Sequence, residues 1–351
     1  MNPNGPSRDQ ELAAVRHNDR VSDVWHDLAQ VPRDLGPTVV TVGNFDGVHR
    51  GHQAVLGRLV DTATARGHRS VVVTFFPHPK AVHDPDHQPE LITGIDDRVG
   101  RIAATGVDGI VVQPYTLEFA QLTPEQFVRD YLRDGLGART VVVGRDTRFG
   151  RGNAGDVDTL RQLGEALGVD VEIVDDAAGA DAGARRWSST WVRELLDAGD
   201  MDAAAGILGC PHRLRGVVVH GDKLGRQIGF PTANLQVTAG FIPRHGVYAA
   251  WLEVVDADGN QQAQPWRGVR LPAAVSLGVN YTVGGSQVRV EAYVLDHTGL
   301  DVYDATVVLD LVRWRRPMLD FGGVDALISA LGEDVIWVRE VLGLEAGTSS
   351  Q

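Results

Sequence analysis

A change of pattern near the middle of the chain constrains the fold more than any other feature. Between about residues 37 and 175, short β-branched runs alternate with segments of helical character: PTVVTVG, SVVVTFF, GIVVQPY, TVVVG and VDVEIV. Near-continuous apolar strands separated by helices predict a parallel sheet that is covered on both faces. From residue 213 onward, apolar runs follow one another between Gly, Asp and Asn turns, which favours an antiparallel barrel. The two patterns therefore predict two domains of different type.

The segment between the two patterns separates the predicted domains. DDAAGADAGARR, at residues 175–186, is small and acidic and indicates a loop or linker. It leads into SSTWVRELLDAGDMDAAAGILG, a helical stretch whose Ser/Thr cluster is suited to capping it. A last helix is expected at about residues 324–342. We therefore expect one domain at residues 20–209 and a second at 213–345.

Composition excludes several classes of protein. The formal net charge of −13 argues against nucleic acid as the main partner, because that binding depends on neutralising phosphates. Small anionic ligands stay compatible, since they need only local donors. The polar N-terminus does not resemble a secretory signal, and no run approaches the roughly 20 apolar residues of a membrane span. The single cysteine, Cys210, excludes an internal disulfide and favours the cytoplasm.

A first candidate site lies in GNFDGVHRGH, residues 43–52, where the first strand of the α/β pattern passes into a helix. Ligands of parallel sheets bind beyond the carboxyl ends of the strands, and a helix N-terminus offers free N–H groups. Three glycines permit close backbone approach, and His49 and His52 can donate hydrogen bonds to phosphate oxygens. A zinc site would need a third protein ligand. A role as general base is possible, but the local sequence does not require it. The simplest alternative is a pair of capping or surface histidines. The combination favours phosphate binding.

A second candidate site lies in VVVHGDKLGRQIGFPTANL, residues 217–235. Its glycines indicate a loop between strands, and Lys223 and Arg226 give that loop positive charge. Thr232 and Asn234 are hard oxygen donors one residue apart, so in an extended segment both project to one face and suit Mg²⁺. The alternative is an ordinary glycine-rich hairpin loop.

Glu291, in QVRVEAYVLD, is a candidate base because an unpartnered carboxylate in an otherwise apolar strand is energetically costly. Alternation places Val290 and Ala292 on one face and Arg289 and Glu291 on the other. Periodicity alone does not decide whether the second face meets solvent or a site.

These segments resemble, in order, the motifs of the bacterial bifunctional riboflavin kinase/FAD synthetases. The resemblance rests on GNFDGVHRGH, VVVGRDTRFGRGNAGD (141–156), SSTWVRELLDAGDMDAAAGILG (188–209) and GFPTAN, and it spans about residues 25 to 343. It implies a Rossmann-like HxGH nucleotidyltransferase domain that joins FMN and ATP into FAD and pyrophosphate. It further implies a mainly antiparallel riboflavin kinase barrel with a C-terminal helix, and ATP and Mg²⁺ for both steps.

In the first domain, the resemblance assigns His49 and His52 to the phosphates of ATP and Asp146 to the nucleotide region. It places Arg193 near the leaving phosphates, and the other members of the phosphate set are Gly43, Asn44, Phe45, Gly47, Gly51, Ser188, Ser189 and Thr190. The attacking phosphate of FMN is already largely ionised at neutral pH, because its second pKa is about 6. Such a site needs alignment and charge stabilisation more than it needs a base.

In the barrel, the resemblance makes Glu291 the base for a neutral ribityl hydroxyl and makes Thr232 and Asn234 the metal ligands. The implied ATP-binding set is Gly221, Lys223, Gly225, Arg226 and Gly229, and the implied flavin-binding set is Phe230, Pro231, Arg316 and Phe321.

The sequence departs from the family pattern at Phe76, Thr147, Tyr281, Met318 and Asp320. Two alternatives therefore stay open: a chain that retains only one of the two activities, and a flavin- or nucleotide-binding regulator without turnover. The expected partners are the small molecules riboflavin, FMN and ATP, with no nucleic acid and no membrane. Assembly into a homo-oligomer stays open.

Overall fold

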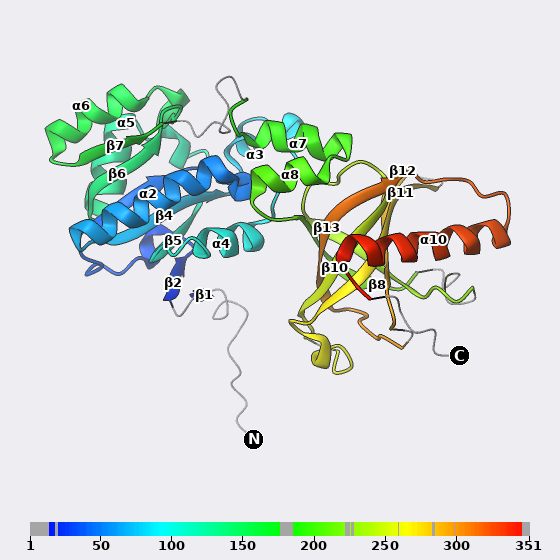
Figure 1. The fold of residues 1–351 in the computed structure, drawn as a ribbon. Helices are drawn as coiled ribbons and strands as arrows, with labels where there is room; N and C mark the ends of the chain where they lie inside the picture. The colour runs from blue at the N-terminus through cyan, green and yellow to red at the C-terminus, as the bar shows by residue number, and fades with distance from the viewer. Residues whose placement is uncertain are drawn as a thin grey trace. The chain divides into compact units, whose positions relative to one another are not determined.

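The computed structural model describes residues 14–17, 20–175, 185–221, 225, 228–258, 260–282, 285–297 and 299–345. The chain forms two compact units (Figure 1), one made of residues 1–90 and 95–188 and the other of 91–94 and 189–351. Among the helices that the structure describes, none combines the length and apolar character needed to cross a membrane.

The first unit is built on a seven-stranded sheet. Its order is β1-β2-β5-β4-β3-β6-β7, with β1 (Ala14–His17), β2 (Arg20–Trp25), β3 (Thr38–Val42), β4 (Arg69–Phe76), β5 (Gly109–Pro114), β6 (Ala138–Gly144) and β7 (Asp170–Val174). All neighbouring pairs are parallel except β1–β2. The five strands predicted from the β-branched runs are present. The order reverses between β3 and β6, and such a switch point is where ligands bind in open α/β sheets.

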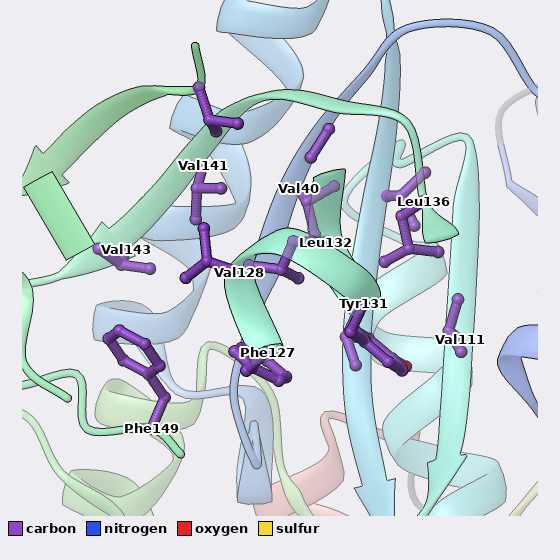
Figure 2. Close-up of a cluster of buried hydrophobic side chains, with 14 of the residues drawn as sticks. Val40, Val111, Phe127, Val128, Tyr131, Leu132, Leu136, Val141, Val143 and Phe149 are labelled. Carbon is purple, nitrogen blue, oxygen red and sulfur yellow. The ribbon is translucent and has the colours of Figure 1, made fainter. Parts of the chain in front are cut away.

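Helices cover both faces of this sheet because successive strand residues point to opposite sides. One face packs against α2 (Arg50–Arg66) and α4 (Ile95–Ala103), with Val39 and Val72 against Leu56 and Leu59. The other face packs against the π-helix η5 (Phe127–Gly135) and α6 (Val157–Leu167). Figure 2 shows this second cluster, in which side chains of η5 pack with valines of the strands and with Leu136 and Phe149. The labelled residues are Val40, Val111, Phe127, Val128, Tyr131, Leu132, Leu136, Val141, Val143 and Phe149.

Shorter helices connect these elements. They are η1 (Leu28–Gln30), η2 (Asp46–Val48), α3 (Pro79–His83), η3 (Pro85–His87), η4 (Phe119–Gln121), α5 (Pro124–Gln126) and η6 (Arg151–Asn153). Helix α5 begins with a complete capping box between Thr123 and Gln126, the start signal that its sequence contains.

The second unit begins with α7 (Ser189–Ala198) and α8 (Met201–Leu208). The sequence suggested one helical stretch here, but Gly199 adopts a left-handed φ of 77° and ends the first helix. Asp200 then caps the second by accepting a hydrogen bond from the backbone N–H of Ala203 at 3.1 Å. The interruption turns one predicted helix into a helical hairpin.

The rest of the second unit is a closed antiparallel barrel in the order β10-β11-β12-β9-β8-β13. Its strands are β8 (His212–Val219), β9 (Thr232–Ala239), β10 (Gly246–Asp256), β11 (Arg270–Thr282), β12 (Gly285–Val294) and β13 (Thr306–Arg316). The short helix η7 (Gln264–Trp266) lies in a connection, and α10 (Val324–Leu342) packs against β10 and β11. The predicted barrel and the predicted last helix are both confirmed.

Candidate active sites

The turn after β3 has a strained backbone. Phe45 and Val48 have left-handed φ values of 48° and 45°, and Gly47 between them has 81°. A left-handed conformation is unfavourable for an L residue and most of all for β-branched valine, so the surroundings must enforce it. Side chains from three elements hold the turn: Thr74 donates to the carbonyl of Asn44 at 3.1 Å, Arg101 to Gly47 at 3.2 Å and Gln53 to Val48 at 2.8 Å. Strain concentrated in one fixed turn is typical of a binding site.

The two histidines of this turn form one stacked unit. Their ring centroids lie 3.7 Å apart with an interplanar angle of 20°, and Phe45 meets the ring of His52 edge-on at 5.2 Å. His49 is the N-cap of α2, and its Nδ1 accepts a hydrogen bond from the backbone N–H of His52 at 3.4 Å. Because Nδ1 accepts, the proton of a neutral His49 ring lies on Nε2. His49 thus offers an N–H donor at the helix N-terminus.

Both histidines are neutral at physiological pH. Burial lowers the pKa of His49 to about 4, with Arg186 adding to the effect and Asp146 opposing it. Burial also lowers the pKa of His52 well below 6.5, and His49, Arg98 and Arg186 lower it further. The site can therefore supply imidazole donors without imidazolium charge, and the cations near it are arginines.

Asp146 follows β6, the strand beside β3 at the switch point of the sheet. It forms a 2.8 Å ion pair with Arg186, and its charge influences His49. The structure therefore brings together His49, His52 and Asp146 and adds Arg186. The sequence analysis missed this arginine, although Arg185 and Arg186 stand directly before the Ser/Thr block.

A second arginine that the sequence analysis missed is buried behind the turn. Arg98 on α4 is fully buried, and its Nη1 donates to the carbonyl of Phe75 at 3.2 Å. Its Nε and Nη2 atoms have no hydrogen-bond partner among the described residues. Burial lowers the pKa of Arg98, and the nearby carboxylate of Asp46 opposes that shift. The guanidinium charge of Arg98 is therefore buried.

A cavity of about 610 Å³ opens beside this turn. Gly43 and Asn44 line it, whereas His49 and His52 are not among its described lining residues. Part of its wall is formed by aromatic side chains that were not predicted from the sequence: Phe75, Tyr115, Phe119, Phe127 and Phe149. Tyr115 is held by a 3.0 Å hydrogen bond to Nε2 of His83. The size suits a flat ring system, since ligand cavities usually measure about 300–1,000 Å³.

Two of the departures from the family pattern lie near this cavity. Thr147 lines it. Phe76 is 47% exposed at the end of β4 and is not among the described lining residues, whereas its neighbour Phe75 is. The Thr147 substitution therefore changes the cavity wall itself.

The predicted Ser/Thr block stands at the start of α7. Ser188 precedes the helix, Ser189 and Thr190 open it, and Arg193 lies partly buried one turn on. Its assignment to the leaving phosphates stays a prediction.

The barrel contains a separate cavity of about 300 Å³. Thr232, Asn234 and Glu291 all line it. In the strand register, Asn234 of β9 lies directly opposite Glu291 of β12. Val290 and Ala292 are fully buried, so the alternate face that carries Glu291 is the one that meets the cavity.

An arginine joins the candidate base to the candidate metal ligand. Nε of Arg289 lies 2.6 Å from Oε1 of Glu291, and its Nη2 donates to Oδ1 of Asn234 at 3.3 Å. Arg289 also lines the cavity. The sequence analysis noticed only that it shares a face with Glu291.

Gly221, which follows β8, lies close to Asn234. A Cβ at Gly221 would lie 2.3 Å from Nδ2 of Asn234, so any larger residue would displace the Asn234 side chain. Gly225 lines the cavity, and Gly229 lies at the turn before Phe230. The predicted cations Lys223 and Arg226 lie outside the described residues.

The residues predicted to bind flavin divide between two hollows. Phe230, Arg316 and Phe321 line the 300 Å³ cavity, with the Arg316 guanidinium 5.3 Å from the Phe321 ring centroid. Pro231 lines an adjacent hollow of about 40 Å³ together with Thr232. Met318 lines the larger cavity and is 50% exposed. Asp320 accepts a hydrogen bond from the backbone N–H of Gly322 at 3.1 Å and is not among the described lining residues.

The donors present fit a hard cation in the barrel. In the part of the chain that the structure describes, no three or more His, Cys, Asp or Glu side chains are arranged so that they could hold a metal ion. A hydroxyl and an amide oxygen on one cavity wall suit Mg²⁺, which retains waters and shares its ligands with phosphates. Thr232 and Asn234 provide that pair.

The first unit has a strained turn at the switch point of its sheet, beside a cavity large enough for a flat ring system. The barrel has a carboxylate beside hard oxygen donors. Together the fold and the two sites define a two-domain transferase that acts on nucleotides. Family models agree, since FAD synthetase matches residues 31–190 and riboflavin kinase matches residues 208–342. The chain belongs to the bifunctional riboflavin kinase/FMN adenylyltransferase family.

Curated relatives with that name span nearly the whole chain. The protein from Pseudomonas fluorescens is 39% identical over 306 residues, which cover 86% of this chain and 92% of that one. The protein from Escherichia coli K12 is 34% identical over 319 residues, covering 91% and 96%. A solved structure from Streptococcus pneumoniae, described as a macrolide-efflux protein, is 29% identical with a TM-score of 0.78 and covers 91% of this chain and 98% of that one. The fold class and family predicted from the sequence are confirmed, and the chain is an enzyme of two-step flavin cofactor synthesis.

Proposed function

We propose that the barrel phosphorylates riboflavin to FMN and that the parallel-sheet domain adenylylates FMN to FAD, each at the residues described above. The observation that carries the proposal is the Asn234–Glu291 register, which sets a hard oxygen donor directly opposite a carboxylate at a cavity. We assign the kinase to residues 213–345 and adenylyl transfer to residues 20–209. Helices α7 and α8 are assigned to the adenylyltransferase because of the chemistry of the Ser/Thr block. In the structure they belong to the same compact unit as the barrel.

In the kinase step, a ribityl hydroxyl attacks the γ-phosphorus of ATP, the bond to the bridging oxygen breaks and ADP leaves. The hydroxyl is neutral, so its proton needs an acceptor, and Glu291 is placed to take it. Thr232 and Asn234 would hold Mg²⁺, which supplies charge neutralisation for the phosphates when bound. Phe230, Arg316 and Phe321 would hold the flavin against the same cavity.

In the adenylylation step, the FMN phosphate attacks the α-phosphorus of ATP and pyrophosphate leaves. The attacking oxygen is already charged, so no base is required. The neutral N–H donors of His49 and His52, the N-terminus of α2 and the cation of Arg186 would stabilise the phosphates.

We place the isoalloxazine ring of FMN in the aromatic cavity of the first unit. Tyr115, Phe119 and Phe75 give flat apolar walls for stacking. Gly43 and Asn44 at the same cavity would direct the FMN phosphate toward the β3–α2 turn, where the transfer takes place.

The single cysteine, Cys210, supports placing the enzyme in the reducing cytoplasm.

One incubation tests the function. The protein is incubated with riboflavin, ATP and Mg²⁺, and the flavins are separated by chromatography. Formation of FMN and then FAD supports both assignments. FMN alone would remove the adenylyltransferase assignment, and neither product would favour a regulator that binds without turnover.

A further inference from the structure

Arg289 occupies the space between the two halves of the proposed kinase site. It contacts Glu291, the proposed base, through Nε at 2.6 Å, and Asn234, the proposed metal ligand, through Nη2 at 3.3 Å. Its position follows from strand geometry, because Arg289 and Glu291 are two residues apart on β12 and therefore share a face. One guanidinium thus contacts both the residue proposed to activate the riboflavin hydroxyl and a residue proposed to hold the metal of ATP.

A purely structural role explains this arrangement poorly. The side chains of Arg289 and Glu291 are 34% and 28% exposed, so solvent screens the ion pair. Pairs of this kind contribute little to folding stability. Both residues line the 300 Å³ cavity.

The chemistry of phosphoryl transfer calls for a cation at this place. The transferring group passes from ATP at Thr232 and Asn234 to the hydroxyl at Glu291, and its negative charge spreads over three oxygens. A guanidinium is planar, permanently charged and able to donate from several N–H groups at once. The other described arginine of the cavity, Arg316, is held by the carboxylate of Asp334 through both Nε and Nη2.

We propose that Arg289 is a further catalytic residue of the kinase half, whose guanidinium contacts the transferring phosphoryl group; the proposal rests on the kinase assignment above. Nε stays on Oε1 of Glu291 and leaves Oε2 to accept the hydroxyl proton. Nη2 exchanges Oδ1 of Asn234 for an oxygen of the phosphoryl group. The hydroxyl oxygen bonds to the γ-phosphorus as the bond to the bridging oxygen breaks, and ADP leaves with that electron pair.

The test compares three substitutions of this arginine in the full chain: Arg289→Gln, Arg289→Lys and Arg289→Ala. Arg289→Gln should lower kcat for FMN formation by about 100-fold or more, with KM for riboflavin within about threefold, because the lost interaction acts on the transition state. Arg289→Lys should retain part of the activity, since an ammonium keeps the charge but cannot reach both partners. Added guanidinium chloride at low millimolar concentration should restore Arg289→Ala at least tenfold, and NaCl of equal ionic strength should not.

Two controls make the result decisive. FAD formation from supplied FMN reports the other site and should not change in any of the three variants. Arg313→Gln removes another barrel arginine, 51% exposed and paired with Asp202 at 3.0 Å, and should leave FMN formation unchanged. A kcat for FMN formation within threefold of wild type in folded Arg289→Gln overturns the proposal, as does a loss that guanidinium does not restore. If Arg289→Gln does not fold, Arg289→Lys decides: wild-type kcat overturns the proposal. A wild-type enzyme that makes no FMN would instead refute the kinase assignment.

Discussion

The carboxylate of Asp334 joins α10 to the barrel, and its removal should unfold the kinase half at a lower temperature. Asp334 is 1% exposed. It accepts hydrogen bonds from Nε and Nη2 of Arg316 at 3.1 and 2.6 Å, and Nη1 of Arg315 lies 3.2 Å away. Both arginines belong to β13, so one carboxylate fixes the last helix against the last strand. Substitution by alanine leaves both cations without this partner.

The size of the effect follows from burial on the two sides of the interaction. Breaking a buried ion pair by removing one partner costs about 3–5 kcal/mol. The arginine side chains are 20% and 18% exposed and can turn partly toward water, which reduces the expected loss to about 2–4 kcal/mol. For a unit of this size each kcal/mol moves the melting temperature by about 2–4 °C, so Asp334→Ala should melt roughly 5–15 °C lower.

The neighbouring residue provides the matched control. Glu333 lies on the same helix, but its side chain is 70% exposed and 4.0 Å from Arg315. Glu333→Ala should therefore change stability by less than about 0.5 kcal/mol. Both variants are heated in steps and assayed for residual FMN formation, with the transition followed by circular dichroism. Inactivation of Asp334→Ala within 1 °C of Glu333→Ala would show that the Asp334 ion pairs do not stabilise this half.

Three further predictions concern the individual sites. The folded-state pKa of His49, about 4, lies below its unfolded value of 6.5, so its contribution to stability is complete above pH 6.5 and declines as the pH falls toward 4. In NMR spectra the ring protons of His49 should not titrate between pH 5.5 and 8, and a midpoint near 6.5 would contradict the buried neutral ring. Tyr115→Ala should raise KM for FMN in FAD formation about tenfold by removing an aromatic wall and leave FMN formation alone; an unchanged KM would argue against flavin in that cavity. Gly221→Ala should lower FMN formation at least tenfold, because the new Cβ would lie 2.3 Å from Nδ2 of Asn234. Wild-type FMN formation in that variant would show that the loop has room.

The sequence predicted best the elements that are buried on both sides. The runs at β3 to β7 are rich in β-branched residues because helices cover both faces of the sheet, so the strands can be predicted directly from the sequence. Strands β1 and β2 were missed because AVRH and RVSDVW mix polar and apolar residues at an edge of the sheet. The break at Gly199 was missed because one glycine inside a helical pattern does not by itself end a helix.

The sequence identified the chemistry of the sites better than their electrostatics. The motif predicted that His49 and His52 lie at a strand-to-helix turn, and they do. Their neutral state depends on burial and on Arg98 and Arg186, which are distant in sequence and reach the site only through the fold.

In the barrel, the alternation of apolar and polar residues put Glu291 on the face opposite Val290 and Ala292. It did not predict which of the two faces meets the cavity. That choice is made by the register of β12 against β9, a long-range pairing that places Asn234 opposite it. The contact of Arg289 with both residues has the same origin.

The two transfers take place at two independent sites, one that needs a base and one that does not. The most direct measurement assays Glu291→Ala and His52→Ala separately for FMN formation from riboflavin and for FAD formation from supplied FMN. We expect Glu291→Ala to abolish only the first activity and His52→Ala to reduce strongly only the second. Equal loss of both activities in either folded variant would contradict two independent sites.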